Sequence, residues 1–531
     1  MTLLYSLVLV VRPSVVMCKI AWLFIRGGAA GPMNRGGGAV SVCSNSLQDQ
    51  FNQHVSEDDH QMSGSGAGIL YVDLDGTLIQ SDVLIESVFS LLKSNPFALF
   101  MFPVWFLQGR AHFKREVARR VDIDVANLPW TPDFLDYLRR CREEGRRLVL
   151  ITASDQKYAD AVANQLGLFD GAVGSDGITN LSGRRKVERM LTESAEAVFD
   201  YAGNSGKDLE IWPRAKQALV VNALPRVLAK ARESSNVTQV FNPLENLAQK
   251  VLRAARAHQW LKNLLLFVPL VFSHRIMEGT LFLQAIAGFV SFGLCASGVY
   301  LLNDLFDLEN DRRHPTKRNR IVASGVLPLD LVAALIPLLL FGSVLVAMLL
   351  PSGFLIVLTV YFVTTFAYSL RLKQIVILDV LLLSALYTLR LLAGGAATGV
   401  TVSYWLLVFS LFFFLSLAML KRYTELSTLD EVAGRGYQSG DDQLLKQFGT
   451  ASGYIAVLVL ALYINSDQIR IQYDWPEAIW LLCPVMLYWV ARVWLLAHRD
   501  QMHEDPVMFA IRDRTSHFLI ALSLSILWIA S

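Results

Sequence analysis

The hydrophobic and polar positions divide the chain into two parts of different character. Between about residues 60 and 256, apolar runs are short and alternate with segments that carry Arg, Glu and Asp throughout. From residue 259 onward, long apolar runs follow one another with brief polar interruptions. A run of about 20 apolar residues can cross the hydrocarbon core of a bilayer as a helix. The pattern therefore predicts a soluble domain followed by a helical membrane domain with several spans.

Nine apolar segments are candidates for membrane spans by this length rule, although several of them are short. They lie at about residues 263–274, 281–302, 328–350, 353–370, 376–398, 403–420, 450–465, 477–495 and 515–531. Basic residues gather in the loops after the even-numbered spans, and the alternate loops are short or lightly charged. Because basic loops stay on the cytoplasmic side, we expect a multi-pass protein of the cytoplasmic (inner) membrane with its soluble domain in the cytoplasm.

The second predicted span runs directly into an acidic motif. Asp304, Asp307 and Asp311 are spaced i, i+3 and i+7, so a helix would place their carboxylates on one face. Asn303 shares that face with Asp307 at i, i+4. Carboxylates at the end of a membrane helix are costly unless they face water, a metal or each other, and Mg²⁺ prefers hard oxygen ligands. The motif predicts a site for Mg²⁺ and a diphosphate, and the alternative is a solvated acidic loop.

The composition agrees with a membrane protein and excludes some other classes. The chain has 531 residues, of which 53% are hydrophobic and 18% charged, and its mean hydropathy is +0.40. This length exceeds that of one ordinary domain. Five scattered cysteines form no motif for a disulfide framework or a zinc site. The net charge of +2 indicates no particular partner, and we expect no nucleic acid to bind.

Residues 1–61 are expected to be a disordered leader or the product of a mis-assigned start. Their apolar stretch is interrupted by Arg12, Pro13 and Lys19, and neither half is long enough to span a bilayer. Translation beginning at Met33 or Met62 is the alternative.

A short apolar strand at residues 68–72 runs into Asp73-Leu-Asp75-Gly-Thr. A strand that ends in this DxDGT motif resembles the first motif of the haloacid-dehalogenase-like phosphohydrolases. Asp73 would attack phosphorus and form an aspartyl-phosphate. Asp75 would protonate the leaving oxygen and then activate water.

Three later segments fit the remaining motifs of that family. A second apolar strand, residues 147–152, ends at Thr152, which the resemblance assigns to the phosphoryl group. Lys186 fits the cation that balances the phosphate and the nucleophile. Asn204 and Asp208 fit the turn that holds Mg²⁺ together with the two aspartates of the first motif. Asn204 stands where the family usually has an acid, and it offers a neutral carbonyl oxygen instead of a charge.

The resemblance implies a Rossmann-like α/β domain at about residues 66–236, with a helical cap at about 82–131 and a linker at 237–257 that leads to the membrane domain at 258–531. The cap contains an apolar run at residues 95–107 that is too short to span but suited to a membrane interface. Basic residues suited to anionic head groups follow this run: His112, Lys114, Arg115, Arg119 and Arg120. The alternative is that the run forms the packed core of the cap.

The acidic motif and its surroundings resemble the NDxxDxxxD signature of the UbiA-type intramembrane prenyltransferases, over residues 255–531. The Gln-Trp-Leu-Lys262-Asn segment, the basic loop that ends at Arg320 and the loop from Tyr368 to Lys373 also fit. The resemblance implies an all-α bundle with a central cavity open to lipid. It also implies that the aspartates bind Mg²⁺ and a diphosphate at the cytosolic mouth of the cavity.

The second half of this site departs from the members that prenylate aromatic rings. Those members carry a second acidic cluster after the fourth span, whereas this chain has one acid, Asp379, with Arg371, Lys373 and Arg390. A basic half suits a second substrate with an additional phosphate. The pattern looks like the branch that transfers phosphoribose from phosphoribosyl diphosphate to decaprenyl phosphate. Positive-inside anchoring explains Arg371 equally well, but not Asp379 and Arg390.

Together the two resemblances imply a Mg²⁺-dependent membrane transferase fused to the phosphatase that acts on its product. Phosphoribosyl diphosphate and a polyprenyl phosphate or diphosphate lipid are the expected substrates. The phosphatase would remove the 5-phosphate of the lipid product. The residues expected to bind substrate are Asn303, Lys262, Arg320, Tyr368, Arg371, Lys373, Asp379 and Arg390.

Two other functions stay open. One is a prenyltransferase that joins a polyprenyl diphosphate to an aromatic acceptor. The other is a non-catalytic soluble domain that binds phospholipid or regulates the bundle. Asn204 favours this last function, whereas the intact set of Asp73, Asp75 and Lys186 opposes it. The sequence leaves the oligomeric state and the chain length of the lipid undetermined.

Overall fold

A computed structural model describes residues 68–193, 198–242, 246–428, 436–438, 440–466, 473–502 and 505–530. The described residues belong to one compact unit, Gly68–Ser531, which contains a sheet domain followed by a helical domain. The predicted leader at residues 1–61 lies outside the described residues.

The sheet domain has six parallel strands in the order β3-β2-β1-β4-β5-β6. They are β1 (Ile69–Val72), β2 (Leu148–Asp155), β3 (Gly171–Ser175), β4 (Phe199–Gly203), β5 (Ala218–Val221) and β6 (Val237–Phe241). The order changes direction between β1 and β4, which is where open α/β sheets bind their ligands beyond the carboxyl ends of the strands. The sheet confirms the predicted Rossmann-like α/β class.

Helices cover both faces of the sheet, as a parallel sheet requires. Alternate residues of β1 point to opposite faces: Leu70 and Val72 pack with helices α7 (Pro132–Glu143) and α8 (Gln156–Leu166). On the other face, Tyr71 packs with α9 (Arg184–Glu193) and α10 (Pro225–Ser234). Because both faces are buried, the strands read as continuous apolar runs in the sequence.

The cap predicted between β1 and α7 is helical. It contains α4 (Val83–Ser94), η1 (Pro96–Met101), α5 (Phe102–Leu107), α6 (Arg110–Ala118) and η2 (Val125–Asn127). One side of the apolar run packs into the cap through Ala98 and Trp105. The other side is open, with Phe97 76%, Phe100 75% and Leu107 88% exposed. The run therefore supplies both part of the cap core and an exposed apolar surface.

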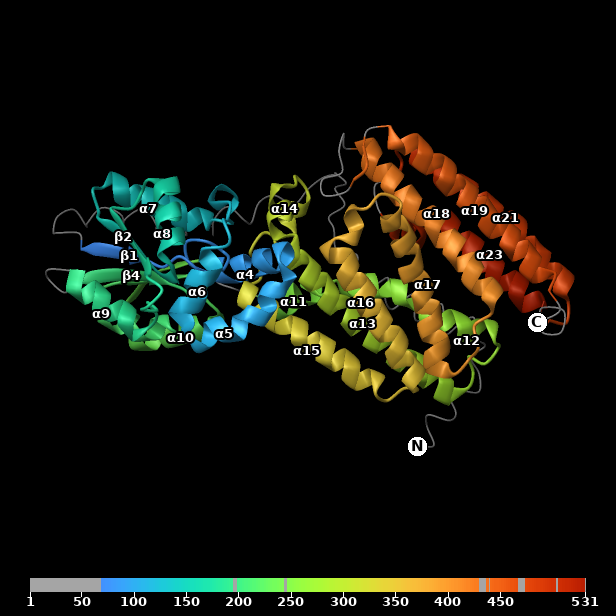
Figure 1. Ribbon diagram of the computed structural model, residues 1–531, viewed down its shortest axis with the longest axis horizontal. Helices are drawn as coiled ribbons and strands as arrows, with labels where there is room; N and C mark the ends of the chain where they lie inside the picture. The colour runs from blue at the N-terminus through green and yellow to red at the C-terminus, as the bar shows by residue number, and fades with distance from the viewer. Residues whose placement is uncertain are drawn as a thin grey trace, which may run out of the picture. The chain divides into compact units, whose positions relative to one another are not determined.

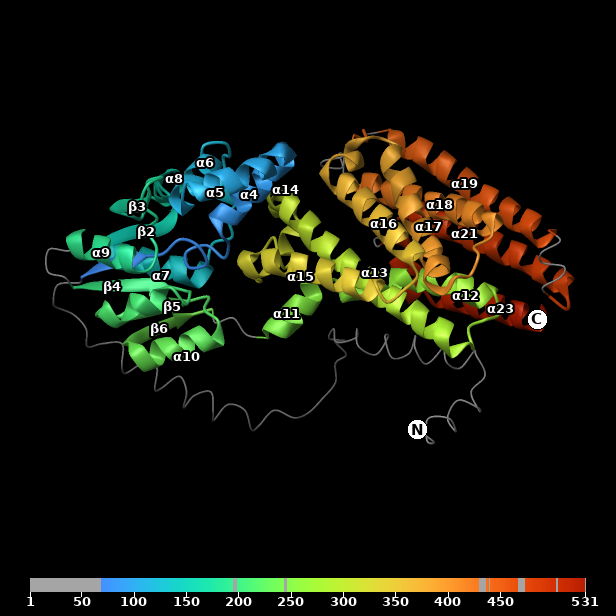
Figure 2. The same cartoon turned by 60° about the horizontal axis from the view of Figure 1, so that its bottom comes forward.

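The helical domain contains seven helical segments long and apolar enough to cross a membrane, within the described residues. Six are α13 (Gly279–Phe306), α15 (Leu329–Ala347), α16 (Ser352–Leu370), α17 (Leu378–Thr398), α18 (Tyr404–Thr428) and α19 (Asp441–Ile464), and the seventh, Pro476–His498, combines η8 (Pro476–Leu481) and α21 (Leu482–His498). Helix α13 packs against α15, α16 and α17, and the row α16 to α19 continues side by side to α21 (Figures 1 and 2).

Shorter elements connect these spans. They are α11 (Leu247–Ala254), η5 (Ala257–Phe267), α12 (Val268–Phe272), α14 (Leu308–Arg313), η6 (Lys317–Asn319), η7 (Leu372–Gln374), α22 (Pro506–Arg512) and α23 (Arg514–Ala530). The predicted number of nine spans is not confirmed. The first predicted span is a 3₁₀ segment and a five-residue helix, and the last is α23, whose 17 residues extend only about 26 Å.

Candidate active sites

The phosphatase motifs meet at the carboxyl edge of the sheet. Asp73 follows β1 directly, Thr152 lies in the second half of β2, and Asp208 closes the turn after β4. Lys186 reaches the same point from α9. Because the carboxyl ends of neighbouring parallel strands share one edge, motifs separated by more than a hundred residues converge there.

Asp73 has the geometry of a held nucleophile. Its Oδ1 accepts hydrogen bonds from the backbone N–H of Leu74 at 2.8 Å and pairs with Nζ of Lys186 at 2.8 Å. Asp73 also lines the cavity, and its Oδ2 has no partner among the described residues. Burial raises the pKa of Asp73 to about 6, Lys186 opposes this rise, and Asp208 adds to it. One carboxylate oxygen is therefore fixed, as the predicted role of Asp73 as a nucleophile requires.

Asp75 is held by three donors. Its Oδ1 accepts from the backbone N–H of Val83, the first residue of α4, at 2.9 Å. Its Oδ2 accepts from Ser154 Oγ at 2.6 Å and from Thr152 Oγ1 at 3.2 Å. Thr152 therefore contacts the carboxylate of Asp75, at the end of the strand where a phosphoryl group would lie. Ser154 is a contact of Asp75 that the motif-based prediction missed.

Asp208 stabilises the fourth motif. Its Oδ2 accepts from the backbone N–H groups of Asn204 at 3.1 Å and Ser205 at 2.8 Å. Its Oδ1 accepts from the hydroxyl of Tyr201 at 2.7 Å, and Lys186 Nζ donates to that hydroxyl at 3.0 Å. A Cβ on Gly76, which has φ +74°, would lie 1.9 Å from Asn204 Nδ2. The Asn204 side chain therefore packs directly on the turn of the first motif.

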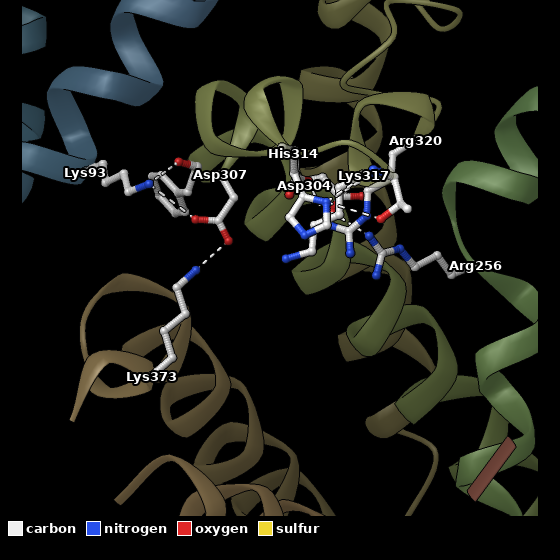
Figure 3. A network of polar contacts seen from close by, with 11 residues as sticks. Lys93, Arg256, Asp304, Asp307, His314, Lys317, Arg320 and Lys373 are labelled. Carbon is white, nitrogen blue, oxygen red and sulfur yellow. Dashed lines mark hydrogen bonds and ion pairs between the residues drawn. The ribbon is translucent and has the colours of Figure 1, made fainter. Parts of the chain in front are cut away.

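The acidic motif of the helical domain is divided by a break in the helix. Helix α13 ends at Phe306 and α14 begins at Leu308, with Asp307 between them. Asp304 and Asp311 lie together and share Arg320, at 3.4 Å and 2.7 Å. Asp307 lies apart from them (Figure 3). The i, i+3, i+7 spacing predicted one shared face, whereas Asp307 contacts Lys93 and Lys373 and the other two carboxylates share Arg320.

Each aspartate of this motif contacts at least one cation. Arg256 adds a second cation to Asp304. Lys93, from α4 of the cap, donates to Asp307 Oδ1 at 3.2 Å, and Lys373 donates to Asp307 Oδ2 (Figure 3). The charges of these carboxylates are thus balanced by basic side chains. The same cations lie where the oxygens of a diphosphate would need counter-charges.

A second group of charges lies inside the bundle. Arg390 is buried and donates to Asn263 Oδ1 at 3.0 Å and to the hydroxyl of Tyr361 at 3.2 Å. Lys262 pairs with Asp505 Oδ2 at 3.0 Å, and Lys421 pairs with the same oxygen at 3.2 Å. Lys262 and Lys421 therefore share one carboxylate among the described residues, and Arg390 is hydrogen-bonded to neutral groups, which leaves positive charge for an anionic ligand.

A close helix contact brings this group together. A Cβ on Gly394 of α17 would lie 2.0 Å from the backbone oxygen of Leu266, so η5 and α17 touch backbone to backbone. This contact places Asn263 beside Arg390. Nδ2 of Asn263 is buried with no hydrogen-bond partner in the part of the chain that the structure describes. A buried donor without a partner is costly, so a ligand acceptor fits this position.

Asp379 and Tyr368 lie in a different cluster. Asp379 is fully buried, and its carboxylate accepts from Arg422 Nε at 2.6 Å and from the hydroxyl of Tyr437. Arg422 also pairs with Glu425 and donates to the Tyr368 hydroxyl at 3.4 Å. These contacts join α16, α17 and α18, so the cluster stabilises the bundle.

Sequence reasoning missed several members of the two transferase clusters: Lys93, Arg256, Asn263, Lys421 and Asp505. The segments of Lys421 and Asp505 were expected only to add charged groups on the same face of the membrane domain as the site. No sequence pattern indicated that Lys93 contacts the acidic motif, because the contact joins residues more than two hundred positions apart. Of the remaining predicted residues, Arg371 is exposed at the end of α16, and Asn303 lies on α13 beside Asp304.

Two known families match the chain. The UbiA prenyltransferase family matches residues 265–521, and the haloacid dehalogenase-like hydrolase family matches residues 70–202. The uncharacterized protein y4nM of Sinorhizobium fredii is 39% identical over 85% of this chain and 89% of its own length. Decaprenyl-phosphate phosphoribosyltransferase of Mycolicibacterium smegmatis is 30% identical over 54% of this chain and 93% of its own length.

Among solved structures, a UbiA homolog from Archaeoglobus fulgidus bound to DMAPP and Mg²⁺ aligns with 53% of this chain and 99% of its own, at 17% identity and a TM-score of 0.43. From the sequence relatives and the family matches, the chain belongs to the UbiA prenyltransferase family and carries a haloacid dehalogenase-like hydrolase domain before it. The chain is thus a multi-pass membrane enzyme, and the predicted fusion of the two families is confirmed.

Proposed function

We propose that the chain transfers phosphoribose from phosphoribosyl diphosphate to a polyprenyl phosphate and then removes the 5-phosphate of the lipid product. The observation that carries this proposal is the buried cluster around Arg390, Lys262 and Lys421, in which cations outnumber carboxylates. An aromatic acceptor brings no phosphate to such a cluster, whereas a phosphorylated sugar or lipid does. The 30% identity to decaprenyl-phosphate phosphoribosyltransferases supports the same substrates.

The donor would bind across the two charge clusters. Its diphosphate would lie at Asp304, Asp307 and Asp311, where Mg²⁺ would stabilise the departing pyrophosphate. Lys373 and Lys93 would then exchange the carboxylate of Asp307 for diphosphate oxygens.

The remaining phosphates would lie in the buried cluster. Arg390 and Asn263 Nδ2 would bind the 5-phosphate or the lipid phosphate. An oxygen of the polyprenyl phosphate would attack the anomeric carbon as pyrophosphate leaves.

The geometry at β1 supports the proposed phosphatase step. Asp73 Oδ2 would attack phosphorus while Asp75 gives a proton to the leaving oxygen, and Lys186 would balance the charge. No cluster of three or more His, Cys, Asp or Glu side chains arranged for a metal occurs among the described residues. Mg²⁺ usually keeps several waters, so Asp73, Asp208 and the carbonyl oxygen of Asn204 fit it as a partly hydrated ion.

Both sites would lie at the cytoplasmic face of the membrane, as the distribution of basic loops indicates. A tethered second site meets the product of the first at high effective concentration, which is a physical reason for the fusion.

The transfer step is tested with membranes that contain the full chain, polyprenyl phosphate, Mg²⁺ and phosphoribosyl diphosphate labelled in the ribose. We expect label in the lipid fraction, and we expect an Asp304→Asn variant to lose it. Prenylation of an aromatic acid, with no labelled lipid from phosphoribosyl diphosphate, would identify the chain as an aromatic prenyltransferase instead.

A further inference from the structure

The phosphatase cavity has walls from both domains. It has a volume of about 430 Å³ and contains Asp73, Asp75 and Lys186 at its catalytic end. The cap contributes Phe106 and Arg110. A further wall comes from Lys250 of α11, from the loop before α15 (Gly325, Val326 and Pro328) and from the first two residues of α15 (Leu329 and Asp330). A substrate in this cavity therefore touches the transferase domain while it is hydrolysed.

This added wall is fixed in place by close contacts. Gly325 has φ +73°, and a Cβ there would lie 2.0 Å from the backbone oxygen of Gln80, so the two loops touch backbone to backbone. Arg312 donates to both carboxylate oxygens of Glu86 on α4, at 2.8 Å and 2.7 Å. Both side chains of this pair are less than a tenth exposed. Buried, bidentate ion pairs of this kind are specific in geometry. The pair between Arg312 and Glu86 therefore holds the segment before α15 against the cap, beside the cavity.

The part of the cavity beyond the catalytic residues is both basic and apolar. Its charged side chains are four cations and two carboxylates: Arg110, Lys114, Lys207, Lys250, Asp82 and Asp330. Arg110 and Lys250 form no ion pair among the described residues, and the apolar lining beside them includes Val326 and Phe106. Phe106 is 55% exposed and belongs to the apolar run of the cap, which continues outward to Leu107.

We propose that this cavity binds an amphiphile that carries two phosphates, and that the transferase wall selects it. The terminal phosphate monoester would lie at Asp73. A second phosphate, in diester linkage to an apolar alcohol, would lie between Arg110 and Lys250. The apolar chain would leave past Phe106 and Val326 along the exposed run of the cap. This assignment rests on the proposed function, because the phosphoribosyl lipid has these three parts in this order.

The reaction itself is ordinary phosphomonoester hydrolysis. Asp73 Oδ2 forms a bond to phosphorus, the bond from phosphorus to the sugar oxygen breaks, and Asp75 supplies the proton to that oxygen. Water then attacks the aspartyl-phosphate, Asp75 takes its proton, and inorganic phosphate leaves. The second phosphate stays in the lipid, so it acts only in binding.

The test uses the detergent-solubilised full chain and three prepared substrates: an isoprenyl phosphoryl-ribose 5-phosphate, the isoprenyl monophosphate and ribose 5-phosphate. We expect the first to be preferred over the other two by about tenfold or more in kcat/KM. Arg110→Ala and Lys250→Ala should each lower the ratio of kcat/KM for the two-phosphate lipid to that for ribose 5-phosphate by about fivefold, and Lys250→Arg should restore it. Lys230→Ala, on the exposed face of α10, is the matched control and should leave the ratio unchanged.

Equal kcat/KM values for the three substrates would overturn the inference, and so would variants that lower hydrolysis of the lipid and of ribose 5-phosphate by the same factor. Since the substrate is supplied ready-made, the result does not depend on the transferase step. A chain that hydrolyses the two-phosphate lipid selectively but forms no lipid from phosphoribosyl diphosphate would leave the inference standing and contradict the proposed function. A chain that forms the lipid but does not select it for hydrolysis would contradict this inference and leave the proposed transfer reaction standing.

Discussion

At the scale of single residues, the two sites are built from carboxylates that cations hold in place. Lys186 and the backbone of Leu74 fix one oxygen of Asp73. In the helical domain, Arg320 joins Asp304 to Asp311. The motif spacing predicted these carboxylates, because their chemistry requires fixed residue types. It also predicted Lys186 and Arg320, but it could not predict Lys93, since that partner comes from a distant segment that only the fold brings near Asp307.

The pH dependence of hydrolysis follows from the position of Asp73. Burial raises its pKa to about 6, so its carboxyl group is protonated and unable to attack at lower pH. We expect the phosphatase rate at limiting Mg²⁺ to fall as the pH decreases through about 6. A bound divalent ion favours the charged form, so the acidic limb should move to lower pH as Mg²⁺ is raised. Measured pH–rate profiles at two Mg²⁺ concentrations check this, and a limb that does not move would contradict it.

Arg390 is expected to be essential for transfer. A Lys at this position keeps the charge but loses the fork that reaches both Asn263 and Tyr361. We expect Arg390→Lys to raise the KM for phosphoribosyl diphosphate or for the lipid phosphate by roughly 10–100-fold, the range for a hydrogen bond to a charged group. Steady-state kinetics with each substrate varied in turn identify the affected one. Arg275→Ala, which removes an exposed pair with Glu278, is the control, and an equal effect there would contradict the assignment.

At the scale of elements, helix α4 contacts both candidate sites. Its first residue, Val83, donates a backbone hydrogen bond to Asp75 of the phosphatase, and Lys93 in its last turn donates to Asp307 of the transferase. The sequence predicted a helical cap here, and the structure confirms the helices. The sequence did not predict that α4 also contacts the acidic motif of the helical domain. A lysine on the polar face of a cap helix does not indicate a partner in another domain.

Lys93 is therefore expected to act in a reaction outside its own domain. Lys93→Ala removes one of the two cations at Asp307, and we expect a several-fold increase in the KM for phosphoribosyl diphosphate, since the pair is partly exposed. Transfer kinetics measure this, and Lys93→Arg should restore most of the wild-type value. Lys230→Ala again serves as the control. A variant with unchanged KM would show that Lys93 has no part in donor binding.

At the scale of the whole molecule, the two domains share a cavity and a buried ion pair. The resemblance carried by the four motifs implied the parallel sheet, and the apolar length of the spans predicted the helical membrane domain. The number of spans was less predictable. Residues 263–274 have the composition of a span, yet Pro269 lies in a five-residue helix that follows a 3₁₀ segment. The shared cavity was unpredictable, since it depends on how two folded surfaces meet.

The measurement that tests transfer followed by dephosphorylation most directly uses phosphoribosyl diphosphate with one radiolabel in the ribose and another in the 5-phosphate. Membranes with the wild-type chain should form a lipid that keeps the ribose label and loses the 5-phosphate label over time. Membranes with Asp73→Asn should accumulate a lipid with both labels in the input ratio. A wild-type lipid that keeps both labels, or the absence of ribose label from the lipid, would contradict the account.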